Sequence, residues 1–139
     1  MTPVTGTGHL ITLDRIVSIE AGSKATAQRH VPNTLAIFDS HFPRKPVLPG
    51  VLILGSMGQL AALLLEHTAG GRWRLVGANR VRYRHFVQPG DTMELTVELK
   101  ERTDDTAVCG ATATVDGKVV TTATKLHLQP LTARGGGQP

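Results

Sequence analysis

The sequence predicts an α+β protein in which a curved antiparallel sheet wraps around one long central helix. Residues 51–67 are apolar almost throughout, with Pro49-Gly50 before them and Gly70-Gly71 after them, which is typical of a buried helix. Residues 92–100 alternate faultlessly between polar and apolar side chains, which indicates a strand with one buried face. Because strand-like segments continue after Gly71, we expect the sheet to curl and cover the helix on most sides.

Two strands are expected before the helix. Residues 9–20 and 23–31 have strand character, and the turn at Ala21-Gly22 predicts that they form a hairpin. A short segment, residues 35–40, then leads to His41. Three prolines follow within seven residues, and they restrict the chain to an extended loop before the helix begins.

A strand is expected over residues 72–87, and in a regular strand Arg80, Arg82 and Arg84 would share one face. A turn at 88–91 and a two-residue hairpin at Asp116-Gly117 separate the later strands, and together the strands after the helix predict an antiparallel meander of three or four strands. The inward residues of the 92–100 strand are Met93, Leu95, Val97 and Leu99. Those of the 106–115 strand are small, which indicates close approach to the helix: Ala107, Cys109, Ala111 and Ala113. The last strand is expected over residues 118–128.

Composition limits the class of protein. A chain of 139 residues has room for one domain with a core, which we expect over residues 1–130, with a loose tail at 131–139. The formal charge of +4, from 15 Lys and Arg against 11 Asp and Glu, favours acidic partners. Aromatic residues are few and do not interleave with basic ones, so nucleic-acid binding is not expected.

Other features bear on location and metal binding. The single cysteine, Cys109, excludes an intramolecular disulfide and a cysteine metal cluster, and its small neighbours indicate a core position. Residues 1–6 carry neither the basic nor the long apolar region of a signal peptide. The apolar segment contains two glycines and would make a poor membrane span. We therefore expect a cytoplasmic protein with no membrane contact and no metal site.

One stretch has a specific pattern. It reads His41-Phe42-Pro43, then Pro46-Val47-Leu48-Pro49-Gly50-Val51-Leu52-Ile53-Leu54, with Met57 and Gln59 further along. This motif resembles the signature of the 3-hydroxyacyl-acyl-carrier-protein dehydratases of fatty acid synthesis. Similar segments at 13–15, 84–91 and 115–120 extend the resemblance to about residues 9–128. The resemblance implies the hotdog fold, a curved antiparallel sheet around one central helix.

The resemblance also implies a mechanism. The substrate would be a thioester on the phosphopantetheine of an acyl carrier protein, with no other cofactor. His41 would remove the proton α to the thioester carbonyl, and the backbone N–H of Gly50 would bind the thioester oxygen as negative charge develops. The implied substrate contacts are Phe42, Pro49, Val51, Leu54, Gly55 and Gln59. The residues expected to face the acidic carrier are Arg44, Lys45, Arg82 and Arg84.

The chain departs from the family at one position. The family's helix carboxylate, which protonates the departing hydroxyl, stands fourteen residues after the histidine, where this chain has Gly55. Ser56 and Gln59 are poorer proton donors than a carboxylic acid. Glu66 is roughly 16 Å further along the helix axis, which is too far. Asp39, two residues before His41, is another candidate, although its residue type is also typical of a turn.

Members of the resembled family pair as dimers, and the histidine of one subunit meets the carboxylate of the other. A homodimer of this chain would hold two incomplete sites, whereas a heterodimer with a carboxylate-bearing paralogue would hold one complete site. Three functions stay open: a dehydratase of fatty acid, polyketide or polyene synthesis, alone or as a half-site partner; a hotdog thioesterase or isomerase with a different general base; and a non-catalytic acyl-binding subunit.

Overall fold

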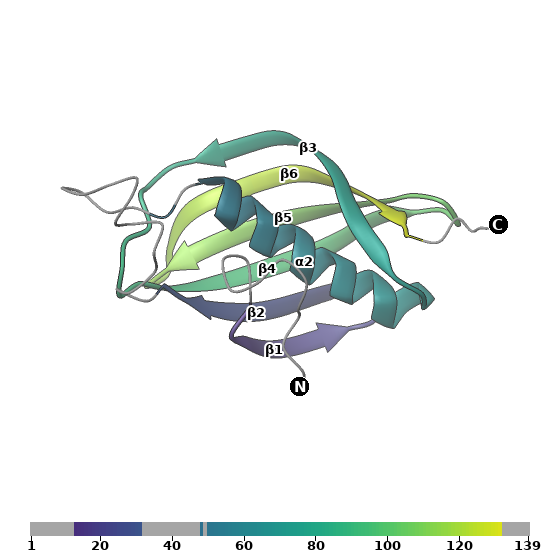
Figure 1. Cartoon of the computed structure of the whole chain (residues 1–139), viewed down its shortest axis with the longest axis horizontal. Helices are drawn as coiled ribbons and strands as arrows, with labels where there is room; N and C mark the ends of the chain where they lie inside the picture. The colour runs from purple at the N-terminus through teal and green to yellow at the C-terminus, as the bar shows by residue number, and fades with distance from the viewer. Residues whose placement is uncertain (1–12, 32–47, 49, 132–139) are drawn as a thin grey trace.

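The described part of the chain forms a six-stranded antiparallel sheet with a long helix across it (Figure 1). The structure is a computed structural model, and it describes residues 13–31, 48 and 50–131. The strands lie in the order β1-β2-β4-β5-β6-β3. In chain order the elements are β1 (Arg15–Glu20), β2 (Lys24–His30), α2 (Gly50–Ala69), β3 (Trp73–Tyr83), β4 (Thr92–Arg102), β5 (Ala107–Val115) and β6 (Lys118–Pro130). The predicted α+β class is confirmed.

The first hairpin forms as predicted. β1 and β2 pair antiparallel, and the turn between them places Gly22 at φ +80°, a conformation that glycine adopts without strain. The Ser23 N–H donates to the Glu20 carbonyl oxygen across this turn at 2.9 Å. β1 begins at Arg15, later than the residue 9 that we expected, and residues 9–12 lie outside the described part of the chain.

β3 is shorter than predicted, and of the two predicted meanders the three-strand one forms, without β3. β4, β5 and β6 form a three-strand meander, but β3 pairs with β6 at the far edge of the sheet and not with its neighbour in sequence, β4. β3 ends at Tyr83, so Arg84 lies beyond the strand. Arg80 has φ +54°, which interrupts the regular alternation. The prediction that Arg80, Arg82 and Arg84 share one face of a regular strand is therefore wrong, although all three are exposed.

The core lies between the sheet and one face of α2. Eight helix residues are buried: Ile53, Ser56, Met57, Gly58, Leu60, Ala61, Leu64 and Leu65. The inward residues of β4 and β5 are buried as predicted, with Leu99 only partly buried. Gly58 allows β3 to approach the helix, since a Cβ at that position would lie 2.8 Å from Leu75 Cδ2. Cys109 is fully buried, and burial raises the pKa of its thiol to about 12.

The opposite face of α2 is only half-buried. It carries Leu52, Gly55, Gln59 and Leu63, and Val51 at its start is 69% exposed. The expectation that protein covers the helix on most sides therefore holds for one face and not for the other. The helix runs slightly beyond the predicted 51–67, and it ends where Gly70 takes φ +77°. Its length and mean hydropathy of 1.4 would also suit a membrane-crossing helix, a property that core helices of soluble proteins share.

Candidate active site

The structure describes seven of the predicted site residues. Five lie on α2 or at its start (Gly50, Val51, Leu54, Gly55 and Gln59), and two belong to β3 or follow it (Arg82 and Arg84). The predicted base and the other four predicted site residues lie outside the described part of the chain: His41, Phe42, Arg44, Lys45 and Pro49. Asp39 lies outside it as well. The described site is therefore the helix N-terminus and the half-buried face of α2.

A turn at residues 88–91 and the adjoining Val87 hold the chain on both sides of the 32–47 segment. The Leu48 N–H donates to the Val87 carbonyl oxygen at 2.6 Å, and both residues are buried. The Val31 N–H donates to the Asp91 carbonyl oxygen at 2.9 Å, and the Val31 carbonyl oxygen accepts from the Gly90 N–H at 2.7 Å. Val31 and Leu48, the two described residues that flank the 32–47 segment, are thus hydrogen-bonded to adjoining parts of one turn.

An aromatic ring covers the first residue of the helix. A Cβ at Gly50 would lie 2.6 Å from Tyr83 Cε1. With the ring in this position, only glycine fits at residue 50. Tyr83 is 51% exposed, and burial of the rest of its ring raises the pKa of its hydroxyl. The first turn of α2 contains no acidic residue, which leaves the positive end of the helix dipole uncompensated by its own side chains. This end of the helix is suited to stabilise a developing negative charge.

The half-buried face of α2 carries a polar atom without a partner. The Oε1 atom of Gln59 is buried and accepts no hydrogen bond in the described structure. Leaving a buried acceptor unsatisfied costs about 1–3 kcal/mol, so such atoms usually have a partner. Gln59 is one helical turn after Gly55, where the resembled family has its carboxylate. The position next to Gly55 is therefore polar and half-buried, and within the described residues its buried acceptor has no partner.

Ser56, the residue after Gly55, is already engaged by other groups. Its hydroxyl accepts from Arg29 Nη1 at 2.7 Å and donates to the Leu52 carbonyl oxygen at 3.1 Å. Arg29 is only 2% exposed; burial lowers the pKa of its guanidinium, and the charge of Asp14 opposes that shift. Because the Ser56 proton is held by the helix backbone, this hydroxyl is not placed to protonate a leaving group.

Arg29 and Tyr83 are the two residues that the sequence interpretation missed. Ala25, Ala27 and Val31 alternate as buried residues of the second strand, so the same period places Arg29 on the inward face. A charged residue at an inward strand position is the signal in the sequence that identifies Arg29 as a buried charge. For Tyr83 the sequence offered only an aromatic residue between two arginines, which does not predict contact with the helix.

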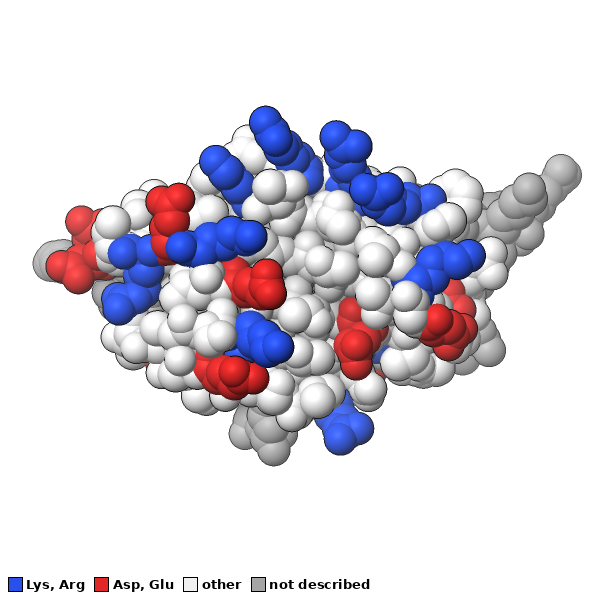
Figure 2. All heavy atoms as spheres, turned by 180° about the vertical axis from the view of Figure 1, so that it is seen from behind, with Lys and Arg blue, Asp and Glu red and all other residues white. Residues whose placement is uncertain are grey.

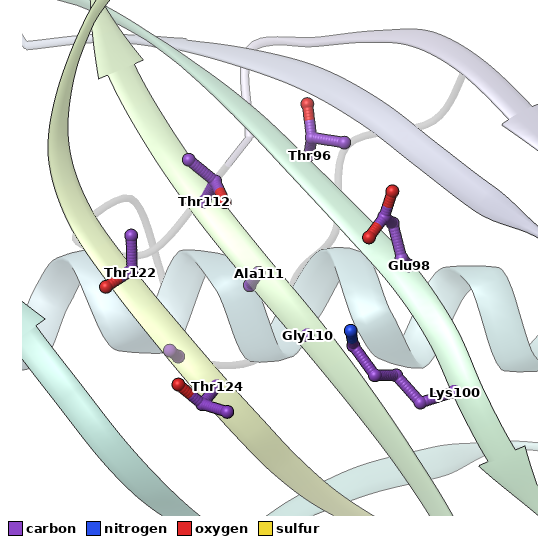
Figure 3. Close-up of a pocket in the computed structure, with 9 residues that line it drawn as sticks. Thr96, Glu98, Lys100, Gly110, Ala111, Thr112, Thr122 and Thr124 are labelled. Atoms are coloured by element: carbon purple, nitrogen blue, oxygen red, sulfur yellow. The ribbon is translucent and has the colours of Figure 1, made fainter.

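Two surface hollows lie apart from this site. One, of about 290 Å³, lies on the sheet face that points away from α2, and Figure 3 shows its threonines with Glu98 and Lys100 in front of the helix. The other, of about 320 Å³, lies beside the 88–91 turn and is lined in part by His85, Phe86 and Asp91. Within the described ranges, no three His, Cys, Asp or Glu side chains gather to hold a metal ion.

Comparison with known proteins identifies the family. Residues 6–124 match the FabA-like domain. The chain belongs to this family. The matched span includes the whole motif, the helix and most of the sheet, so the resemblance that the motif indicates is confirmed.

The FabA-like relatives agree with this assignment. A 3-hydroxyacyl-[acyl-carrier-protein] dehydratase FabZ from Latilactobacillus sakei subsp. sakei (strain 23K) is 40% identical over 117 residues, covering 82% of this chain and 84% of the relative. The dehydratase heterocomplex ApeI:P from Xenorhabdus doucetiae has a TM-score of 0.64 at 24% identity, over 93% of this chain and 99% of that one. An uncharacterized protein from Pyrococcus horikoshii has a TM-score of 0.71 at 18% identity, over 94% and 95%. These structures share the fold, and the predicted hotdog fold is confirmed.

Proposed function

We propose that this chain is a dehydratase-type lyase subunit that acts on 3-hydroxyacyl thioesters of an acyl carrier protein, in fatty acid or polyketide synthesis. The observation that carries the proposal is the 40% identity to a 3-hydroxyacyl-[acyl-carrier-protein] dehydratase over most of both chains. The uncompensated N-terminus of α2 supports it, because dehydration of such a thioester places negative charge on the carbonyl oxygen.

In the proposed reaction His41 takes the proton from the carbon α to the thioester carbonyl. The electron pair left behind delocalises onto the thioester oxygen, where the backbone N–H of Gly50 and the helix dipole stabilise it. The electrons then form the carbon–carbon double bond as the β-hydroxyl leaves. That hydroxyl must receive a proton to depart as water, so the reaction needs a general acid as well as a base. No cofactor is required beyond the phosphopantetheine that carries the substrate.

The general acid is proposed to come from a second subunit. Position 55 is a glycine, and the Ser56 hydroxyl already donates to the Leu52 carbonyl oxygen. The buried Oε1 of Gln59 has no described partner on the same helix face, which suits a carboxylic acid arriving from outside the chain. We propose a heterodimer with a FabA-like paralogue that carries Glu or Asp at the position of Gly55. The Xenorhabdus doucetiae heterocomplex is a dehydratase assembled from unlike chains.

The remaining parts of the proposal concern the carrier and the location. Arg84 is exposed just after β3, close in sequence to Tyr83, whose ring contacts the helix start. With Arg44 and Lys45 of the motif it would attract an acidic carrier to the entrance of the site. Val51 and Leu54, exposed and half-buried respectively, are proposed to contact the acyl chain, together with Phe42 and Pro49. Such an enzyme would work in the cytoplasm.

Restoring the acid tests this proposal. Gly55→Glu is expected to raise the dehydration rate of a 3-hydroxyacyl-pantetheine thioester about 100-fold or more over the wild-type chain alone, which is the typical contribution of a general acid. Gly55→Gln is the matched control, because it has the same size without an acidic proton. Adding His41→Ala to Gly55→Glu should abolish the gain. Full activity of the wild-type chain alone would contradict the proposal and would make Asp39 the next residue to mutate.

A further inference from the structure

One edge of the sheet carries positive charge only. β3 contains Arg74, Arg80 and Arg82, its neighbour β6 contains two lysines, and neither strand contains Asp or Glu. Figure 2, which views the molecule from behind, shows Lys and Arg side chains gathered along the upper margin, where β3 lies in Figure 1. Five of the 15 Lys and Arg residues of the chain lie in residues 72–84. The rest of the chain has ten basic residues and 11 acidic ones. The net positive charge of the chain is therefore concentrated at this edge, which we call the basic edge (β3 with Arg74, Arg80 and Arg82).

The basic edge is also a free pairing edge. β3 is the last strand of the sheet order, so one side of its backbone has no strand partner in the described structure. It is 11 residues long, against six for β1 at the opposite edge. Two large apolar side chains on it are exposed, Val76 at 45% and Tyr83 at 51%. A long edge strand with exposed apolar residues is a ready template for another strand.

The arginines lie where an added strand would contact them. Leu75 and Val81 pack against the core. Arg74 directly precedes Leu75 and Arg82 directly follows Val81, so both arginines point to the outer face of the sheet. Arg82 pairs with Thr122, and Figure 3 shows Thr122 on the sheet face away from α2. Side chains directly opposite each other in an antiparallel pair are about 5 Å apart, where opposite charges stabilise the pair and like charges destabilise it.

We infer that the basic edge selects an unlike subunit: the edge strand of a FabA-like paralogue that carries acidic residues at the positions facing Arg74 and Arg82. A second copy of this chain would bring the same arginines to the same edge and would be repelled unless salt screens their charges. This inference rests on the proposed function, in which a paralogue supplies the missing acid. It assigns Arg82 to the subunit interface and leaves Arg84, beyond the strand, to the carrier.

An edge can also carry charge simply to prevent pairing, and the basic edge has a bulge between Leu75 and Gly77 that would help to do so. Prevention of pairing and selection of a partner predict different responses of the edge to an acidic strand. A blocked edge stays unpaired whatever charge is offered to it, whereas a selective edge pairs once the opposing charges are complementary.

The chain itself provides an acidic partner for the test. Arg74→Glu/Arg82→Glu gives an acidic-edge variant, and sedimentation would follow the wild type, the variant and their mixture at about 50 mM and about 500 mM salt. We expect the mixture to form a mixed dimer about tenfold or more tighter than the wild type alone, with the preference fading at high salt. Arg15→Glu/Arg102→Glu is the control, since both arginines are exposed but lie on other strands; it should show no such preference for the wild type.

A neutral variant is the control for misfolding of the acidic-edge variant. Arg74→Gln/Arg82→Gln removes the repulsion without adding charge, so it should self-associate more tightly than the wild type at low salt. The inference is overturned if the wild type alone dimerises as tightly as the mixture at both salt concentrations. It is equally overturned if the mixture and the neutral variant both stay monomeric, or if the variants lose binding to an acidic carrier protein while their association is unchanged. The dehydration assay is independent of these readouts, so failure of the proposed function would be seen separately.

Discussion

At the scale of single residues, the Arg29 guanidinium is a buried charge held by hydrogen bonds. It lies inside the sheet, donates to the Ser56 hydroxyl at 2.7 Å, and reaches the Leu52 carbonyl oxygen at 3.5 Å. A buried charge is tolerated only when hydrogen bonds replace its water shell. These contacts tie β2 to the second turn of α2, next to Gly55, and so help to hold the helix N-terminus at a fixed position over the sheet.

Removing the acceptor should reveal this contact. Ser56→Ala takes a hydrogen-bond acceptor away from the buried guanidinium, and we expect the free energy of unfolding to fall by about 1–3 kcal/mol in urea titrations. In an Arg29→Met background the same change should cost less than about 0.5 kcal/mol, because the cation that needs the acceptor is gone. Equal costs in both backgrounds would show that the two side chains are not coupled.

Cys109 gives a prediction on pH. Burial raises the pKa of its thiol from 9.0 to about 12, so on alkaline titration the unfolded chain loses this proton first. The free energy of unfolding should therefore fall between about pH 9 and pH 12, by up to about 1.4 kcal/mol per pH unit from this group. Below pH 9 the contribution is fully present. Cys109→Ala should lack this component, and thermal melts of the two proteins at pH 8 and pH 10.5 would measure the difference; parallel pH profiles would refute the assignment.

At the scale of elements, the sequence patterns predicted the long helix and the strands, but not the full order in which the strands lie side by side in the sheet. The apolar segment and its flanking glycines predict α2 to within two residues at either end, and the strict alternation predicts β4. The position of β3 was not predictable, because its alternation says which residues face inward and not which strand lies beside it. Its early end at Tyr83 and the left-handed backbone at Arg80 have no signal in the residue pattern either.

The contact between α2 and β3 depends on a glycine. Gly58→Ala would place a methyl group 2.8 Å from Leu75 Cδ2 and 3.0 Å from its Cβ, so the strand or the helix must shift. We expect a net loss of about 1 kcal/mol in the free energy of unfolding, even though alanine favours the helix by about the same amount. Leu75→Ala removes the nearer atom and should reduce the cost of the second substitution when the two are combined. A more stable Gly58→Ala protein would show that the interface has spare room.

At the scale of the whole molecule, one chain forms the fold, and we propose that it supplies only part of the chemistry. The motif predicted the family, which is confirmed, whereas the oxyanion site at Gly50 stays a prediction. The structure adds the Tyr83 ring over that glycine and the turn that holds both flanks of the 32–47 segment. The sequence could not show that Ser56 is committed to the helix, because that depends on which side chains meet in space. The half-buried helix face, the Gln59 oxygen without a partner among the described residues, and the basic edge support the proposal that a second subunit completes the site.

Mixing two incomplete chains tests this account most directly. The wild type would supply only the base, and a His41→Ala/Gly55→Glu variant would supply only the acid. The two proteins are assayed separately and together on a 3-hydroxyacyl-pantetheine thioester. The salt concentration is about 0.3 M, which screens the charges of the edge arginines. The account predicts that each protein alone is nearly inactive and that the mixture is about 100-fold more active than either. A wild-type chain that is fully active alone, or a mixture no more active than its components, would contradict it.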